Sequence, residues 1–146
     1  MVVIYAHITV VPGREGAFEA AARELAAATL EREPGVRRYE YTRLSDPATY
    51  QAVLAFDDYD AFIEHQASQH HHVIAGGDMR DMIASIRLER VDPVPACSDL
   101  APHDADDPEI EQRQFQPVDE DVLASRRARY RQRYPLTAAA WWDEMT

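Results

Sequence analysis

The sequence contains no lysine, a single cysteine and no long apolar segment, and each of these absences excludes a class of function. All 15 basic residues are arginine, which excludes Schiff-base chemistry because that reaction needs a lysine amine. Cys97 has no partner for a disulfide within the chain, so we expect a reducing, cytoplasmic compartment. The opening MVVIYAHITVV lacks a basic leader, and no apolar run approaches the ~18 residues of a membrane span.

Positive charge is also scarce. The chain of 146 residues has 26 acidic residues and a formal net charge of −11. Nucleic acids and anionic membranes are bound through basic patches that neutralise phosphate, so we expect neither as a partner. The length allows one domain, or one domain with an extension.

Apolar periodicity predicts a mixed α and β order in the first two thirds of the chain. Pro-Gly pairs at 12–13 and 34–35 mark its first two turns. The predicted elements are a strand over 2–11, a helix over 14–33, strands over 36–44 and 49–56, a helix over 59–68, and a strand over 79–91. Between the last two elements, residues 69–78 contain three consecutive histidines and the Gly76-Gly77 pair, and we expect His71 and His72 to lie in a loop.

This order is βαββαβ, which predicts an α+β, ferredoxin-like domain over residues 1–93. Right-handed crossovers give a four-stranded antiparallel sheet with both helices on one face. The other face would be bare, although Val3, Tyr5 and His7 of the first strand are not typical of a solvated surface. We therefore expect a second copy to cover it, as a homodimer.

The composition changes in residues 94–146, for which we predict an acidic linker and a helical extension. Residues 92–121 are rich in proline and acids and lack periodicity. The sequence predicts an arginine-rich helix over residues 122–134. Thr137 then begins a short helix with Trp141 and Trp142, which we expect to dock on the domain or on the neighbouring subunit.

Three segments, VVPGREGAF, EPGVRRYEY and FDDYDAFIEHQASQHH, resemble in order those of the antibiotic-biosynthesis-monooxygenase superfamily. The resemblance covers roughly residues 2–91 and implies a dimeric α+β barrel with one pocket per subunit, between sheet and helices. Members of this superfamily include cofactor-free oxygenases of polyphenolic polyketides, haem-degrading enzymes and isomerases.

The chain departs from both well-understood patterns of this superfamily. The Asn, Trp and Tyr of the polyketide oxygenases align with Ala52, Phe56 and Phe62. The Asn and His of the haem-degrading members align with Ala6 and a position near Ala75, so we do not expect haem degradation. Oxygenation by the polyphenol mechanism would need a different base.

His65, His70, His71 and His72 lie within eight residues of one another and supply such a base. Imidazole titrates near neutral pH and can remove a proton from a phenol or an enolisable carbonyl. We predict His65 and His70 as catalytic, because superfamily members commonly carry histidine at these positions. The alternative is a solvated loop with a histidine filling a helix end.

A metal site is a weaker interpretation of the same histidines. The i, i+5 spacing of His65 and His70 does not match helical ligands, and no HExxH motif is present, so we expect no metal and no cofactor. The predicted substrate-binding residues are Tyr39, Tyr41, Phe56, Phe62, His71, His72 and Met82. The tyrosines and phenylalanines are equally suited to packing.

The sequence thus favours a cofactor-independent monooxygenase that tailors an aromatic polyketide or polyphenol in secondary metabolism. Two alternatives remain open. One is a cyclase or isomerase that uses the same proton transfer without oxygen, and the other is a non-catalytic dimeric binding or stress protein.

Overall fold

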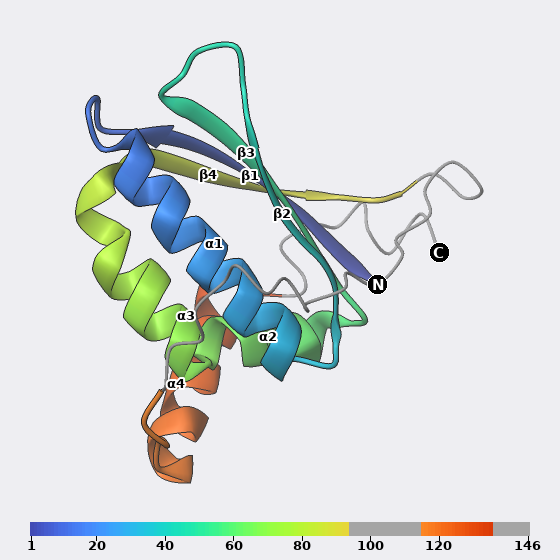
Figure 1. Cartoon of the computed structure of the whole chain (residues 1–146). Coiled ribbons are helices and arrows are strands. Elements are labelled where there is room, and N and C mark those ends of the chain that lie inside the picture. The colour runs from blue at the N-terminus through green and yellow to red at the C-terminus, as the bar shows by residue number, and fades with distance from the viewer. Residues whose placement is uncertain (94–114, 136–146) are drawn as a thin grey trace.

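The computed structural model describes residues 1–93 and 115–135, which form a ferredoxin-like α+β domain and a C-terminal helix (Figure 1). The strands are β1 (Val2–Val10), β2 (Val36–Arg43), β3 (Thr49–Phe56) and β4 (Ile83–Val91). The helices are α1 (Glu15–Arg32), α2 (Tyr59–Ala67), α3 (Gln69–Val73) and α4 (Glu120–Arg133), with a π-helical turn η1 (Ile74–Asp78) and a 3₁₀ turn η2 (Arg80–Met82). The predicted βαββαβ order is confirmed.

The sheet has the strand order β2-β3-β1-β4, and all neighbouring strands are antiparallel. Ile4, Ala6 and Ile8 of β1 are buried on one side of the sheet. This side packs against the helices, which lie together on one side of the sheet in Figure 1. The alternation of apolar residues in β1 therefore fixes which face of the sheet the helices cover.

Strand β4 is less well covered by the helices than its neighbours. Ile86 and Leu88 pair with Ile8 and Ala6, so they share the helix-facing side of the sheet. Their exposed fractions are nevertheless 54% and 38%. The space above this part of the sheet is consequently not filled by core side chains.

The junction between α2 and β4 differs from the sequence prediction. Residues 69–78 are helical, because the Ser68 side chain accepts a hydrogen bond from the His71 backbone N–H and begins a new helix. The predicted strand over 79–91 starts late, at Ile83. The N–H of Met79 bonds to the carbonyl of Ile74, and the N–H of Met82 to that of Met79, so turns satisfy this backbone before the sheet begins.

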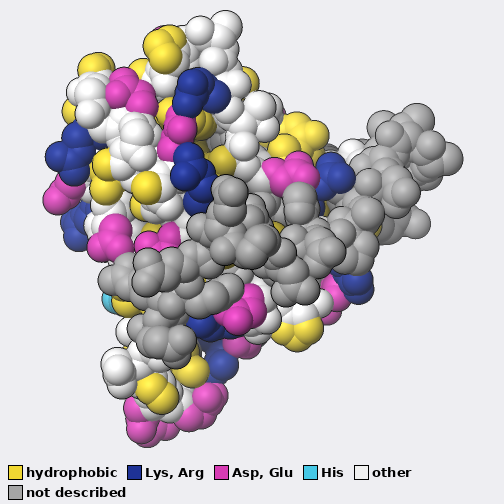
Figure 2. Space-filling view, in the orientation of Figure 1, with side chains coloured by type: hydrophobic (Ala, Val, Ile, Leu, Met, Phe, Trp, Pro, Cys, Tyr) yellow, Lys and Arg dark blue, Asp and Glu magenta, His cyan; other side chains and the backbone are white. Residues whose placement is uncertain are grey.

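The arginine-rich helix predicted over 122–134 is present as α4, which packs against α2. Arg131 pairs with Asp60 at 2.8 Å, and Arg127 pairs with Glu64 at 2.7 Å. Acids and arginines are interspersed on the face drawn in Figure 2, as such pairing requires. Cys97, Trp141 and Trp142, together with most of the predicted linker, lie outside the described residues.

Within residues 1–93 and 115–135, no helix combines the length and apolar character that a membrane crossing would require.

Candidate functional site

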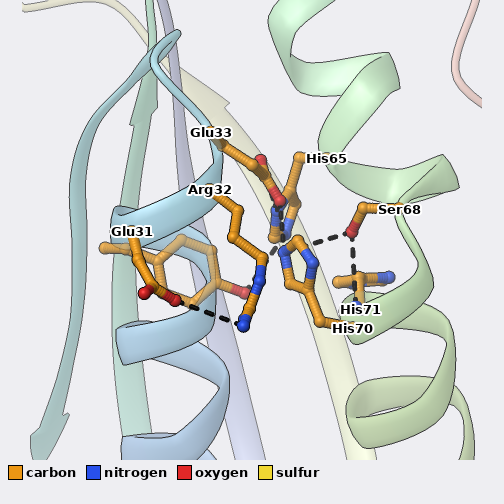
Figure 3. A network of polar contacts seen from close by, with 8 residues as sticks. Glu31, Arg32, Glu33, His65, Ser68, His70 and His71 are labelled. Carbon is orange, nitrogen blue, oxygen red and sulfur yellow. Dashed lines mark hydrogen bonds and ion pairs between the residues drawn. The ribbon is translucent and has the colours of Figure 1, made fainter. Parts of the chain in front are cut away.

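A buried polar network joins the end of α1 to α2 and α3 (Figure 3). Glu33 follows the last turn of α1, where the Pro34-Gly35 pair ends the helix. Both of its carboxylate oxygens lie 3.0 Å from Nδ1 of His65, and Oε1 also lies 2.5 Å from Nε2 of His70. His65 is completely buried and His70 is 5% exposed. Two imidazoles from two helices therefore converge on one carboxylate.

The carboxylate of Glu33 is held in its charged form. Burial alone would raise the pKa of Glu33, but the charges of His65 and His70 and their hydrogen bonds outweigh it and lower this pKa to about 2. A carboxylate accepts hydrogen bonds only, so Nδ1 of His65 carries a hydrogen and donates it. The network is thus built around a permanent negative charge near neutral pH.

The other nitrogen of His65 connects the network to the sheet. Its Nε2 lies 3.2 Å from the hydroxyl of Tyr39 on β2. When His65 is neutral, Nε2 is an acceptor, and the Tyr39 hydroxyl donates to it. Both imidazole nitrogens of His65 are therefore engaged, which fixes the tautomer and the ring orientation.

Glu33, His65 and His70 also have the composition of a metal site, since each offers one ligand atom and these atoms lie within 4.8 Å of one another. The hydrogen bonds already satisfy the same atoms, with the imidazoles donating to the carboxylate. The geometry therefore needs no ion to compensate the buried charge.

A cavity of roughly 890 Å³ lies on the helix-facing side of β1 and β4. Its floor includes the incompletely covered Ile86 and Leu88, and Tyr130 and Arg133 of α4, with Tyr134 at the end of that helix, contribute to its wall. Apolar side chains dominate the lining, with a few polar groups among them. This is the usual composition of a site for a small organic molecule, and the volume is sufficient for a fused aromatic system.

His71 connects the cavity to the polar network. Its ring lines the cavity and packs edge-on against the ring of His65, with 4.6 Å between the ring centroids. Its Nδ1 is buried and has no hydrogen-bond partner among the described residues. Burial, reinforced by the neighbouring His65, lowers the pKa of His71 well below its usual value, so this imidazole is neutral at pH 7 and able to accept a proton.

Two tyrosines from β2, the buried Tyr39 and the partly buried Tyr41, line the same cavity as His71. Burial raises the pKa of Tyr41 to about 12 and that of Tyr39 well above its usual value. Both hydroxyls therefore stay protonated at neutral pH and can donate hydrogen bonds. The cavity wall accordingly combines a neutral imidazole with phenolic hydroxyls.

The structure separates the residues singled out from the sequence into distinct environments. The cavity lining includes Tyr39, Tyr41, Phe62 and His71. His65 and Phe56 lie behind this lining in the core, with ring centroids 5.3 Å apart, and Met82 packs at the edge of the core. His70 borders a hollow that also contains Phe115, and His72 borders a hollow beside α4.

Several residues of the site were not predicted from the sequence. Glu33 is a single acid in an acidic chain, and the sequence gives no sign that two histidines more than thirty residues away contact it. Arg80 lies in the turn that was predicted as strand. Tyr130 and Arg133 lie on α4 and Tyr134 directly follows it, beyond the segment of family resemblance.

Comparison with known proteins gives one family. The family model described as antibiotic biosynthesis monooxygenase matches residues 1–76 of the sequence, just over half of the chain. No curated protein matches the sequence significantly.

Several solved structures have the same fold. A protein from Caulobacter crescentus assigned to the antibiotic biosynthesis monooxygenases is 26% identical, with a TM-score of 0.60 over 64% of this chain and 89% of that one. A protein from Shewanella oneidensis is 30% identical, with a TM-score of 0.57 over 62% of this chain and 87% of that one. A Bacteroides thetaiotaomicron protein is 22% identical, with a TM-score of 0.60 over 64% of this chain and 89% of that one, which supports the fold alone.

Proposed function

Because this chain belongs to the antibiotic biosynthesis monooxygenase family, we propose that it is a cofactor-independent monooxygenase of an electron-rich hydroxyaromatic substrate, such as an aromatic polyketide or polyphenol. The observation that carries the proposal is the apolar cavity with His71 in its wall. Among the described residues the His71 ring forms no side-chain hydrogen bond, and Tyr39 and Tyr41 line the same space.

In this proposal His71 is the base. It takes a proton from the substrate phenol or from an adjacent ring methylene, and the resulting anion is electron-rich enough to react with O₂. For a ring methylene, the overall change R₂CH₂ + O₂ → R₂C=O + H₂O balances without an external reductant. The protonated Tyr41 would donate a hydrogen bond to a substrate oxygen, where negative charge develops, whereas the single hydroxyl hydrogen of Tyr39 is donated to His65.

His65 and His70, which we predicted as catalytic from the sequence, take a positioning role in this proposal. Both nitrogens of His65 are occupied by Glu33 and Tyr39, so it has no nitrogen available to a substrate. It instead orients the Tyr39 hydroxyl and packs against His71. Its replacement should act through these neighbours.

The test is oxygen uptake with 1,8-dihydroxyanthrone, whose methylene is acidic and whose quinone product is coloured. We expect one O₂ consumed per quinone formed, and a rate constant that falls about 100-fold or more in His71→Gln, the usual effect of removing a general base. His72→Gln is the matched control, because the adjacent His72 is exposed and outside the cavity lining. Equal rates for the wild type and His71→Gln would refute this role of His71.

The pH profile gives a second readout. A neutral His71 is the active form and its pKa is lowered, so the rate should be level from pH 6.5 to 8 and fall only at lower pH. His65→Gln should reduce the rate and move that acid limb to higher pH, since the neighbouring His65 is, after burial, the main cause that lowers the pKa of His71.

A cyclase or isomerase without oxygen is the second candidate. The observation that favours it is that Ala52 and Phe62, which align with the Asn and Tyr of the polyketide oxygenases, present only hydrocarbon to the cavity. The same base would then move a proton within the substrate. Conversion of an enolisable aromatic polyketide under anaerobic conditions, without O₂ uptake in air, would select this candidate over the monooxygenase.

A further inference from the structure

The charged groups that line the cavity are of one sign. Among the described residues that form its wall, Arg80 and Arg133 are present and neither aspartate nor glutamate occurs. The chain has 26 acidic residues against 15 basic ones. In the part of the chain that the structure describes, the cavity wall is therefore opposite in charge to the molecule that contains it.

These two arginines also differ from most others in having no acidic partner. Within residues 1–93 and 115–135, neither Arg80 nor Arg133 forms an ion pair. Among the described residues, ion pairs join seven other arginines to nearby acids: Arg32 to Glu31, Arg37 to Asp57, Arg38 to Glu40, Arg43 to Glu19, Arg87 to Glu89, Arg127 to Glu64, and Arg131 to Asp60. The cavity arginines thus keep their guanidinium donors available for a ligand.

Arg133 is carried by a helix that is fixed against the domain. The hydroxyl of Tyr59 donates to the backbone carbonyl of Tyr134 at 2.7 Å, and the rings of Phe62 and Tyr134 lie 5.4 Å apart. Arg131 pairs with Asp60, and Arg127 pairs with Glu64. The two acids lie one turn apart on α2. The end of α4 is therefore a built part of the cavity wall.

We propose that the substrate carries a carboxylate, held by Arg80 and Arg133, while its aromatic rings fill the apolar part of the cavity. This inference rests on the proposed function and specifies the substrate class of the same site. A guanidinium presents paired N–H donors that match the two oxygens of a carboxylate. Tyr130 and Tyr134 line the same cavity, with the Arg133 guanidinium over the ring of Tyr134, and offer aromatic surface to the substrate rings.

The test compares two probes that differ only in the anionic group, 6-hydroxy-2-naphthoate and 2-naphthol. Titration calorimetry under nitrogen measures binding to the full chain without turnover. We expect the naphthoate to bind about tenfold more tightly or better, as hydrogen bonds to a charged group allow. Arg133→Gln and Arg80→Gln should each remove most of this preference, measured as the ratio of the affinities for the two probes.

Arg129→Gln is the matched control, because Arg129 lies on the same helix, has the same charge and does not line the cavity. It should keep the full preference. Equal affinity of the wild type for the two probes would overturn the proposal. The same loss in Arg129→Gln as in Arg133→Gln would also overturn it, since the effect would then be one of overall charge.

Failure of this inference is distinguishable from failure of the proposed function. A wild type that oxidises 1,8-dihydroxyanthrone but does not prefer the naphthoate is an oxygenase of uncharged substrates. A wild type that prefers the naphthoate through Arg80 and Arg133 but consumes no oxygen has the anionic subsite with a different chemistry.

Discussion

Replacement of Glu33 by Gln tests whether the buried network is charged in the way that its geometry indicates. The substitution keeps the shape of the side chain and removes the negative charge that His65 and His70 share. The Glu33 side chain is only 11% exposed, so solvent screens these contacts little. We therefore expect a large effect on stability with a defined pH dependence.

The magnitude follows from the pKa of Glu33. A fall from 4.5 to about 2 corresponds to about 3 kcal/mol of stabilisation of the folded state, at about 1.4 kcal/mol per pKa unit. Because the folded-state pKa is depressed, this contribution is fully present above pH 4.5 and is lost as the pH falls through 2. About 2 kcal/mol of it should already be lost at pH 3.

Urea unfolding at a series of pH values measures this contribution. At pH 6 to 7 we expect Glu33→Gln to lower the free energy of unfolding by about 3 kcal/mol. A carboxyl ¹³C titration of the folded wild type, assigned by the signal that Glu33→Gln lacks, should show Glu33 ionised down to about pH 2. Glu31→Gln is the control, since Glu31 is on the same helix but its side chain is 45% exposed and pairs only with Arg32 at 3.3 Å. A Glu33 carboxyl that titrates at 4.5 or above would refute the reasoning.

Further predictions concern packing and assembly. Gly35→Ala should lower the free energy of unfolding by about 1–3 kcal/mol, because the added Cβ would lie 2.7 Å from Cβ of Ala61. Gly16→Ala, where nothing lies within 4 Å, should raise it by up to about 1 kcal/mol, and urea unfolding checks both. We propose a homodimer, because Tyr5 and His7 are only half-buried on the helix-free face of the sheet. Native mass spectrometry should give twice the chain mass, and a monomer at micromolar concentration would contradict this.

The fold could be predicted because its signals are local. The Pro34-Gly35 pair stops α1 at the residue where the alanine-rich pattern ends, and β1 alternates strictly enough to fix the helix-covered face. The predicted start of the last strand at residue 79 was wrong, because the apolar pattern there conflicts with the hydrogen bonds of the backbone. Met79 and Met82 continue the apolar pattern of β4, but hydrogen bonds to residues 74 and 79 keep this backbone in turns.

The site could be predicted only in part, because a cavity is a property of tertiary structure. The sequence identified Tyr39, Tyr41 and His71 as substrate-binding candidates, since side chains of these types suit a polar wall, and all of them line the cavity. It gave no reason to include Glu33, whose partners come from other helices. Periodicity also could not show that Arg133 of the C-terminal helix lines the same cavity as residues of β4, because the two segments are far apart in the sequence.

The three consecutive histidines show most directly why position along the chain does not determine chemistry. Successive residues of a helix are rotated by about 100° from one another, so neighbours face different surroundings. In α3 His70 faces the Glu33 carboxylate, His71 faces the cavity, and His72 is exposed. The same imidazole is thereby a hydrogen-bonded partner of a buried anion, a neutral base at the cavity wall, and an exposed side chain. The register of α3 decides which of these a histidine becomes, and the N-cap Ser68, which accepts a hydrogen bond from the His71 N–H, fixes that register.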